Sequence, residues 1–241
     1  MKVYCCTQEF ILRHSDFDFK DELKLSAYLA LTQEIAGTSA DELGFGYADL
    51  KPKDMGFIIV NTYCEILRPV RLGEQVKVES WPLPPRHGIF ERAYRVSVSG
   101  EVRANLTSRW CLVDLKTFSL LGAEALGAAH ENCPYRQEKT VEVPAWKIPK
   151  LDGGKEIYTL RIGNSQCDHY LHANNTRYAD FFCDCFSMEE FRPVKSFQIA
   201  YVKQAKEGQE LSLYREDFES ESICEARSGG ELLSQFRIKF A

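Results

Sequence analysis

Hydrophobic positions along the chain follow first a helical and then a strand period, and this order occurs twice. In residues 26–43, apolar side chains fall three and four residues apart, which predicts one buried helix that ends at Gly44. The spacing then changes to two, which predicts strands over residues 58–66, 76–81, 90–98 and 102–112. Ser99-Gly100 is a typical hairpin turn between the last two strands.

The second half of the chain repeats this order. Tyr178, Phe181, Phe182 and Cys185 form a helical stripe, which predicts a second helix from about Asn175 to Phe186. Asn174 or Asn175 is the expected N-cap, because a short side-chain acceptor satisfies a free amide of the first turn. Alternating positions predict strands around residues 197–201, 211–213, 223 and 236–240. The architecture is thus duplicated at a period of about 150 residues.

The pattern in each half of the chain predicts an α+β unit in which a long central helix is wrapped by a strongly curved antiparallel sheet. This arrangement suggests a hotdog fold. Two tandem hotdog domains in one chain would join their sheets edge to edge, which protects the exposed edges. We expect an N-terminal domain over residues 1–130, a linker over 131–155 that contains three prolines, and a C-terminal domain over 156–241. A single large α+β domain is the alternative.

Composition narrows the class of protein. The 241 residues are 44% hydrophobic and 27% charged with a net charge of -5, which is typical of a globular protein and lacks the basic excess of a nucleic-acid binder. No apolar run approaches the ~18 residues of a membrane span, and the N-terminus has no apolar signal region, so we expect a cytoplasmic protein. The nine cysteines are expected to be reduced. Their spacing favours no metal site, and we expect no cofactor.

One stretch departs from the overall acidic balance. It holds five arginines and two acidic residues: Arg86, Arg92, Arg95, Arg103 and Arg109, with Glu91 and Glu101. The solvated face of a strand pair is the favoured interpretation. The functional alternative is a landing patch for an acidic partner.

The candidate chemistry lies just ahead of the second predicted helix, where Asp168, His172, Asn174 and Asn175 follow one another closely. A histidine accepts a proton near neutral pH, and Asp168 is placed to orient it. Free amides at a helix start suit a developing oxyanion. From the residues alone, caps and turn formers are the somewhat favoured interpretation.

This stretch resembles the second-half motif of the acyl-acyl carrier protein thioesterases, which reads approximately Asp-x-Asn-x-His-x-Asn-Asn. Residues 26–44, 68–76 and 107–114 are also similar to the family in order along the chain. The resemblance implies a tandem hotdog fold and hydrolysis of fatty acyl thioesters on acyl carrier protein, which releases a free fatty acid. It implies an acyl-binding first half, a catalytic second half and acyl carrier protein as the partner.

Three positions differ from the family pattern. Tyr170 stands where the motif has its first Asn, Gln204 stands where a Glu is expected, and Ala205 stands where plant members have a Cys. A cysteine nucleophile is therefore excluded at the matched position.

The remaining mechanism is direct attack by water. His172 would remove the proton of the water, and Asp168 would fix the tautomer of the imidazole or stabilise its cation. Asn174, Asn175 and the amides at the helix start would hold the oxyanion. Gln204 would hold the water through its carbonyl oxygen.

Other interpretations stay open. The chain could act on coenzyme A thioesters, or it could be a catalytically impaired acyl-binding protein. A homodimer of two tandem chains also stays open. Phe57, Trp81 and Trp110 are candidates for closing the acyl tunnel, although ordinary core positions are the favoured interpretation of all three.

Overall fold

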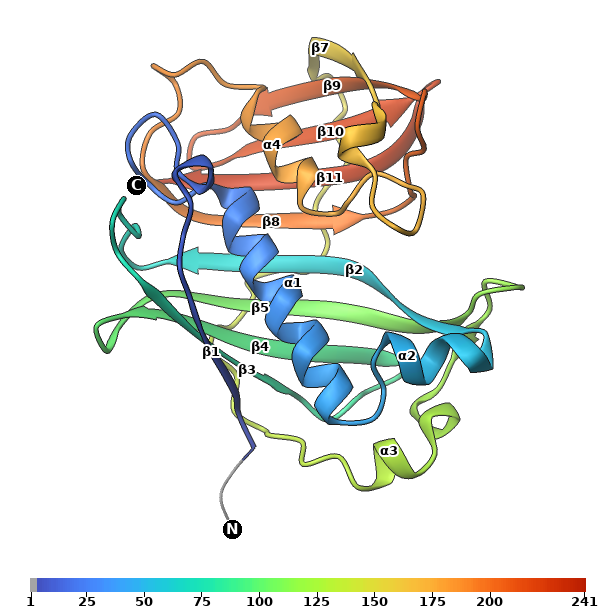
Figure 1. Cartoon of the computed structure of the whole chain (residues 1–241). Coiled ribbons are helices and arrows are strands. Elements are labelled where there is room, and N and C mark those ends of the chain that lie inside the picture. The colour runs from blue at the N-terminus through green and yellow to red at the C-terminus, as the bar shows by residue number, and fades with distance from the viewer. Residues whose placement is uncertain (1–3) are drawn as a thin grey trace.

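The computed structural model describes residues 4–241 and shows a continuous antiparallel sheet that carries two helices on one face (Figure 1). The first half comprises β1 (Cys6–Phe10), α1 (Leu25–Glu42), α2 (Tyr47–Leu50), β2 (Met55–Ile66), β3 (Val76–Pro82), β4 (Ile89–Val98), β5 (Glu101–Asp114), β6 (Leu120–Leu121) and α3 (Ala128–Glu131). The second half comprises β7 (Lys155–Arg161), α4 (Arg177–Cys183), β8 (Val194–Tyr201), β9 (Glu210–Asp217), β10 (Ser222–Ser228) and β11 (Glu231–Phe240). Short 3-10 turns lie at His14–Asp16 (η1), Lys51–Lys53 (η2), Ala123–Leu126 (η3) and Asn164–Gln166 (η4).

The two halves join where β2 pairs with β8. The strand order is β1-β3-β4-β5-β2-β8-β11-β10-β9-β7. The last strand of the first half in this order, β2, therefore pairs with the first strand of the second half, β8, and the two halves form one sheet. Asn61 of β2 lies opposite Ala200 of β8, and the side chains of Asn61 and Gln198 are hydrogen-bonded at 3.0 Å across the junction. The predicted edge-to-edge arrangement of two tandem hotdog units is confirmed.

The predicted first helix is confirmed within one residue at each end. Its buried positions include Tyr28, Leu29, Thr32 and Ile35, which belong to the stripe expected from the sequence. Figure 1 shows α1 running across the curved face of the first-half strands. The chain leaves the helix through Gly44 with a φ of +76°, a conformation that costs glycine little.

The second helix is much shorter than expected. It spans only Arg177–Cys183, so the second half does not contain the long central helix that its periodicity predicted. The helix ends in tighter bonds, because the N–H groups of Cys185 and Phe186 donate to the carbonyls three residues back, at 3.1 and 3.0 Å. Beyond this end, Arg215 of β9 donates to the carbonyl of Cys185 at 2.9 Å and lies 4.1 Å from the centre of the Phe186 ring. Cys185 and Phe186 are therefore buried by contacts with the sheet, outside the helix.

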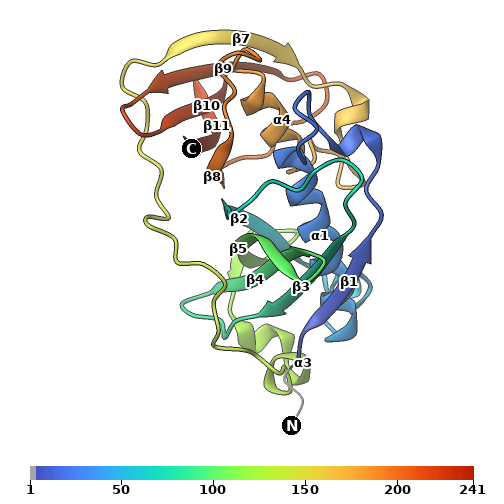
Figure 2. The same cartoon turned by 90° about the vertical axis from the view of Figure 1, so that its left-hand side faces the viewer.

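Residues 132–154 connect the halves without forming a helix or strand. Figure 2 shows this segment on the side of the sheet opposite α1 and α4. Its Trp146 carbonyl accepts hydrogen bonds from the side-chain amides of Asn61 (3.0 Å) and Gln198 (2.9 Å), so the segment is fixed over the junction of the two halves. Within residues 4–241, no helix has the length and apolar character that crossing a bilayer requires.

Candidate active site

The candidate residues lie in one tight loop between η4 and α4. The backbone N–H of Asp168 donates to the carbonyl of His172 at 3.1 Å, and the N–H of Leu171 donates to the carbonyl of Asp168 at 2.9 Å. Leu171 has a φ of 65°, which turns the chain back on itself. This turn brings Asp168 and His172 to the same end of the loop.

The Asp168 carboxylate contacts a different partner from the one expected. Its Oδ2 accepts from Nδ2 of Asn174 at 3.1 Å, and its Oδ1 accepts from the N–H of Tyr170 at 2.9 Å. The Oδ1 of Asn174 accepts from both the N–H (2.9 Å) and the hydroxyl (2.8 Å) of Thr176. Asp168 and Thr176 therefore fix the Asn174 amide from both ends, and the second Nδ2 proton remains for another acceptor. Within the described residues the Asp168 carboxylate makes no hydrogen bond to His172, so this geometry does not support the expectation that Asp168 orients His172, and the carboxylate contacts Asn174 instead.

His172 is half-buried beside this pair. Its Nδ1 lies 3.3 Å from the carbonyl oxygen of Ala173. Because a carbonyl only accepts, this contact assigns the ring proton to Nδ1 and leaves Nε2 as the basic nitrogen. The backbone of His172 pairs with Lys206, and Ala173 donates to the carbonyl of Ala205 at 2.8 Å, so the turn after β8 supports the loop from behind.

An aromatic cluster covers the outer side of His172. The rings of Tyr170 and His172 are nearly parallel, at 12° and 6.0 Å between centroids. Tyr170 also contacts Tyr47 at 5.9 Å, and Tyr47 contacts His169 at 5.5 Å. Burial raises the pKa of the Tyr170 hydroxyl, and the Tyr47 hydroxyl adds to this effect. Tyr47 belongs to α2 of the first half, and no spacing in the sequence indicates that it reaches the loop.

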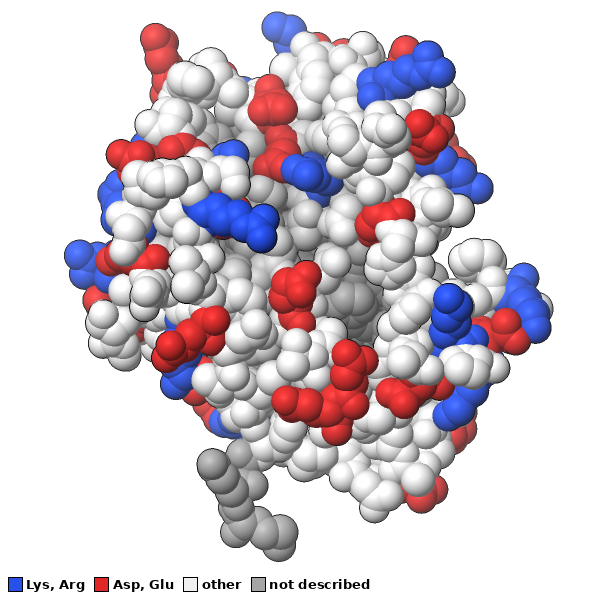
Figure 3. Space-filling model, in the orientation of Figure 1, with Lys and Arg blue, Asp and Glu red and all other residues white. Residues whose placement is uncertain are grey.

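A small cavity lies where the loop meets the first half. It measures about 20 Å³ and is lined by Asn175, Thr176 and Tyr201 on one side and by Thr32, Thr62 and Trp110 on the other. The hydroxyl of Tyr201 donates to the carbonyl of Asn175 at 3.1 Å. Thr62 Oγ1 is buried and has no hydrogen-bond partner within residues 4–241. Figure 3 shows a hollow near the centre of this face, beside the middle of α1 as Figure 1 places that helix.

The remaining residues expected from the sequence are Gln204, Ala205 and the three tunnel candidates, and none of them hydrogen-bonds through its side chain to Asp168, His172 or Asn174. Gln204 is exposed in the turn after β8, and its side chain makes no hydrogen bond with any described residue. Ala205 is fully buried behind the loop. Of the three tunnel candidates, Trp110 lines the small cavity. Phe57 packs against Phe90 and Phe45.

Trp81 belongs to the packing of the connecting segment. It is fully buried, and its indole N–H donates to the carbonyl of Glu138 at 2.8 Å. The guanidinium of Arg136 lies 3.8 Å from the centre of its ring. The core interpretation of Trp81 is therefore the one that its contacts support.

The arginine stretch also has structural contacts. Arg92 and Arg103 are buried, Arg109 pairs with Glu91 at 2.6 Å, and Arg95 pairs with Glu138 at 3.2 Å. These contacts leave Arg86 as the exposed member of the set with no ion pair inside the described chain. The landing-patch interpretation is therefore not supported by this geometry.

Comparisons with known proteins agree with the fold. An acyl-ACP thioesterase from Bacteroides thetaiotaomicron is 22% identical and superimposes with a TM-score of 0.89 over 98% of both chains. The 12:0-ACP thioesterase from Umbellularia californica is 19% identical, with a TM-score of 0.87 over 98% of this chain and 96% of that one. At these identities the similarity concerns the fold.

No curated protein sequence matches the chain. Residues 3–121 match the family model for the N-terminal domain of acyl-ACP thioesterases. The matched range ends before the loop that carries His172, so it does not test the candidate catalytic residues. The chain belongs to the acyl-ACP thioesterase family.

Proposed function

We propose that the protein hydrolyses fatty acyl thioesters carried on acyl carrier protein and releases free fatty acids. The observation that carries this proposal is the Asn174 amide held between Asp168 (3.1 Å) and Thr176 (2.9 Å), with His172 in the same loop. This arrangement provides a base and an oriented hydrogen-bond donor, which are the two groups that thioester hydrolysis needs. Membership of the thioesterase family supports the substrate class.

The chemistry follows from these atoms. Nε2 of His172 removes a proton as a water oxygen bonds to the thioester carbon. The free Nδ2 proton of Asn174 and the backbone N–H of Asn175 stabilise the oxyanion. The C–S bond then breaks, the carbonyl re-forms, and the proton on His172 passes to the departing thiolate. Thiolate is a good leaving group, so the mechanism requires no strong general acid.

The acyl chain enters through the small cavity between the loop and α1. Trp110 and Thr62 lie on its first-half side, which supports an acyl-binding role for residues 1–130. A volume of about 20 Å³ is too small for an acyl chain, so side chains must move when substrate binds. The hydroxyl of Thr62, buried without a partner in the described chain, is placed to donate to a polar group of the ligand.

The test is thiol release from a series of acyl-carrier-protein and acyl-CoA substrates of different chain length. His172→Ala is expected to lose about 10²- to 10⁴-fold in kcat, which is the usual contribution of a general base. His169→Ala is the matched control, because this neighbouring histidine is exposed in the same loop, and it is expected to retain activity. A loss of no more than about threefold for His172→Ala would contradict the assignment of the base.

The choice of carrier is decided in the same assay. Faster turnover of carrier-protein substrates, with a preference that weakens as salt is added, supports the proposal. Equal or faster turnover of acyl-CoA would favour a coenzyme A thioesterase. Binding without turnover on any substrate would favour an impaired acyl-binding protein.

A further inference from the structure

The catalytic loop has a structural duplicate in the first half. Asp18, Lys20, Glu22 and Lys24 take the positions of Asp168, Tyr170, His172 and Asn174 at an offset of 150 residues. The backbone bonds repeat as well. The N–H at the first position donates to the carbonyl at the third, at 2.8 Å in the first half and 3.1 Å in the second. The side-chain Oδ1 at the first position accepts from the N–H at the second, at 2.8 Å and 2.9 Å.

The duplicate loop does not form a second catalytic centre. Glu22 replaces the histidine, is 8% exposed, and its carboxylate contacts Arg71 at 3.0 Å and Lys20 at 3.3 Å. The carboxylate of Glu22 is therefore held by two cations inside the protein. Lys24 replaces the asparagine, and its ammonium donates to the carbonyl of Ser15 at 2.9 Å.

A large cavity nevertheless opens beside this loop. It measures about 680 Å³, against about 20 Å³ beside the catalytic loop. Its apolar walls include Leu23, Leu25, Ile66, Phe186, Phe191 and Val194. The segment after α4 forms one side of it, since Phe186, Met188 and Phe191 line the cavity beyond the end of that helix at Cys183. This volume lies in the range of pockets that bind small molecules.

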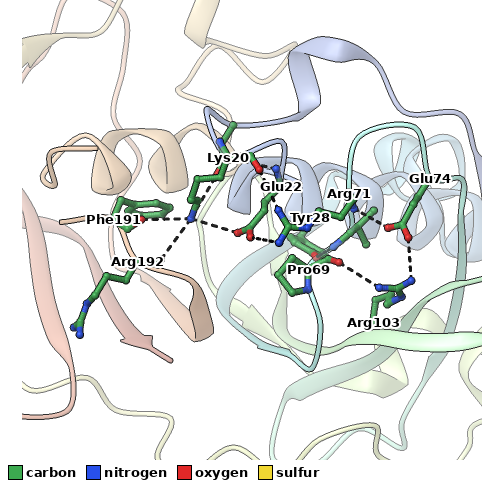
Figure 4. Close-up of polar contacts among 11 residues, drawn as sticks. Lys20, Glu22, Tyr28, Pro69, Arg71, Glu74, Arg103, Phe191 and Arg192 are labelled. Atoms are coloured by element: carbon green, nitrogen blue, oxygen red, sulfur yellow. Dashed lines mark hydrogen bonds and ion pairs between the residues drawn. The ribbon is translucent and has the colours of Figure 1, made fainter. Parts of the chain in front are cut away.

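Lys20 fixes one wall of the cavity. Figure 4 shows its ammonium reaching from the duplicate loop to Phe191 and Arg192, with Glu22 between Lys20 and Arg71. The ammonium donates to the carbonyls of Phe191 at 3.4 Å and Arg192 at 3.5 Å, and it lies 4.6 Å from the centre of the Phe191 ring. The segment after α4 is therefore held against the first half, and the cavity lies between them.

The charged groups around the cavity select the head group of a ligand. The lining contains four acids and two lysines: Asp18, Glu22, Asp180 and Asp184, with Lys20 and Lys24. Both lysines and three of the acids are already engaged within the protein, since Asp180 pairs with Arg177 at 3.5 Å, and Asp184 is the lining acid with no ion pair inside the described chain. Burial raises the pKa of the Asp184 carboxyl, and the charge of Asp180 raises it further. A ligand carboxylate would add negative charge to an acidic wall, whereas an uncharged head would not.

We propose that this cavity is a second, non-catalytic site that binds one unbranched acyl or alkyl chain with an uncharged polar head. It lies at the N-terminal end of α1, whereas the small cavity beside Asn175 and Thr176 lies beside the middle of that helix. An acyl thioester has the required chemistry, and so does a neutral single-chain lipid. The free fatty acid does not have it at neutral pH. The proposal does not depend on turnover at His172.

Methionine methyl groups give a direct readout of this site. Met188 lines the cavity, whereas Met55 packs in a separate cluster with Phe45 and Phe90. In protein labelled with ¹³C-methyl methionine, 1-decanol is expected to shift the Met188 signal in a saturable way. Decanoate at pH 7.5 is expected to bind at least about tenfold more weakly, because its charge meets the acidic wall. A shift confined to Met55, or equal affinity for decanoate, would overturn the proposal.

Substitutions that fill the cavity complete the test. Cys183→Phe and Leu25→Phe add bulk from α4 and α1, and each is expected to weaken 1-decanol binding at least about tenfold. Glu189→Phe is the control, because this exposed residue is adjacent to Met188 but does not line the cavity. Melting temperatures identify any variant that fails to fold. Unchanged binding in a folded cavity variant would refute the site.

The source of the natural ligand is read from two further probes. S-decyl-coenzyme A represents a chain on a thioester carrier but cannot be hydrolysed, and 1-monodecanoylglycerol represents a free neutral lipid. Saturable binding of either at Met188 supports the proposal, and the tighter probe identifies the source. If neither binds there while 1-decanol also fails, the cavity is not an acyl site.

Discussion

Replacing Asp168 by Asn tests the most specific conclusion from the active-site geometry, which is that this carboxylate acts through Asn174. In the variant, an amide N–H could take the place of the oxygen that now accepts from Nδ2 of Asn174 at 3.1 Å. Two donors would then face each other. If the Asp168→Asn amide turned its oxygen there instead, the contact with the N–H of Tyr170 (2.9 Å) would be lost. In the first case Asn174 loses its acceptor, and in the second the side chain that holds Asn174 loses its own anchor in the loop.

The expected loss follows from the strength of one charge-assisted hydrogen bond. Such a bond contributes about 1.5–3 kcal/mol, and each 1.36 kcal/mol is a factor of ten, so kcat/KM should fall about 10- to 150-fold. Asn174→Ala removes the same donor directly and should cause a loss of similar size. Because both changes disable one unit, the double variant should lose little more than either single variant.

The assay is thiol release measured for the wild type, both single variants and the double variant. Asp16→Asn is the matched control, because Asp16 accepts from the N–H of Arg13 at 2.7 Å in the first half, far from His172 in the sequence. It should leave kcat/KM unchanged. Asp168→Asn should remain folded, which the far-UV circular dichroism spectrum checks.

The reasoning is refuted if the two losses are additive. Additivity would mean that Asp168 contributes independently of Asn174, as it would by orienting His172. An Asp168→Asn variant with full activity would refute it equally, because the oriented amide would then be irrelevant to the rate.

Three further predictions concern other sites. Gln204→Ala should change kcat by less than about twofold in the thiol-release assay, because this exposed side chain forms no hydrogen bond with any described residue. A large loss of kcat would instead support the expectation that Gln204 holds the attacking water. Gln198→Leu should reduce the free energy of unfolding in urea by about 1–3 kcal/mol, because it leaves the buried Asn61 oxygen without its 3.0 Å donor; an unchanged midpoint would contradict this. The Arg215 guanidinium lowers the pKa of Glu190 to about 2. Glu190→Gln should therefore destabilise the protein at pH 7 by about 0.2–1 kcal/mol, and the difference from wild type should disappear as the pH falls from about 4.5 to 2; a difference that persists at pH 2 would contradict it.

Local pattern predicted most of the sheet and the first helix. The stripe through Tyr28, Thr32 and Ile35 is local information, and each of these side chains faces the core. The alternation after residue 55 gave β2 and its neighbours for the same reason, since each strand presents one face to a helix. The joining of the halves through β2 and β8 followed from the need to protect two exposed edges.

The second helix and the partner of Asp168 depended on contacts that no local pattern contains. The stripe of α4 continues past its end, but the chain leaves the helix through bonds to carbonyls three residues back, and Arg215, thirty residues away from Cys185, holds the Cys185 carbonyl outside the helix. A spacing of four residues placed Asp168 near His172, but the positive φ of Leu171 turns the loop so that the carboxylate meets Asn174. Tyr47 reaches the loop from the other half of the chain.

The duplicated loop separates residues that build the turn from residues that carry chemistry. Aspartate is the same in both copies, Asp18 and Asp168, because its Oδ1 accepts the same backbone N–H and its own N–H closes the same turn. The positions that differ between the copies include Glu22 and His172, whose side chains form none of the hydrogen bonds that close the turn. Where the second copy has His172, which keeps a free nitrogen, the first has Glu22, which is held by two cations. The same backbone thus presents a histidine in one half and an ion-paired glutamate beside a large cavity in the other. If both proposals hold, the duplicated fold separates turnover and binding between its two ends.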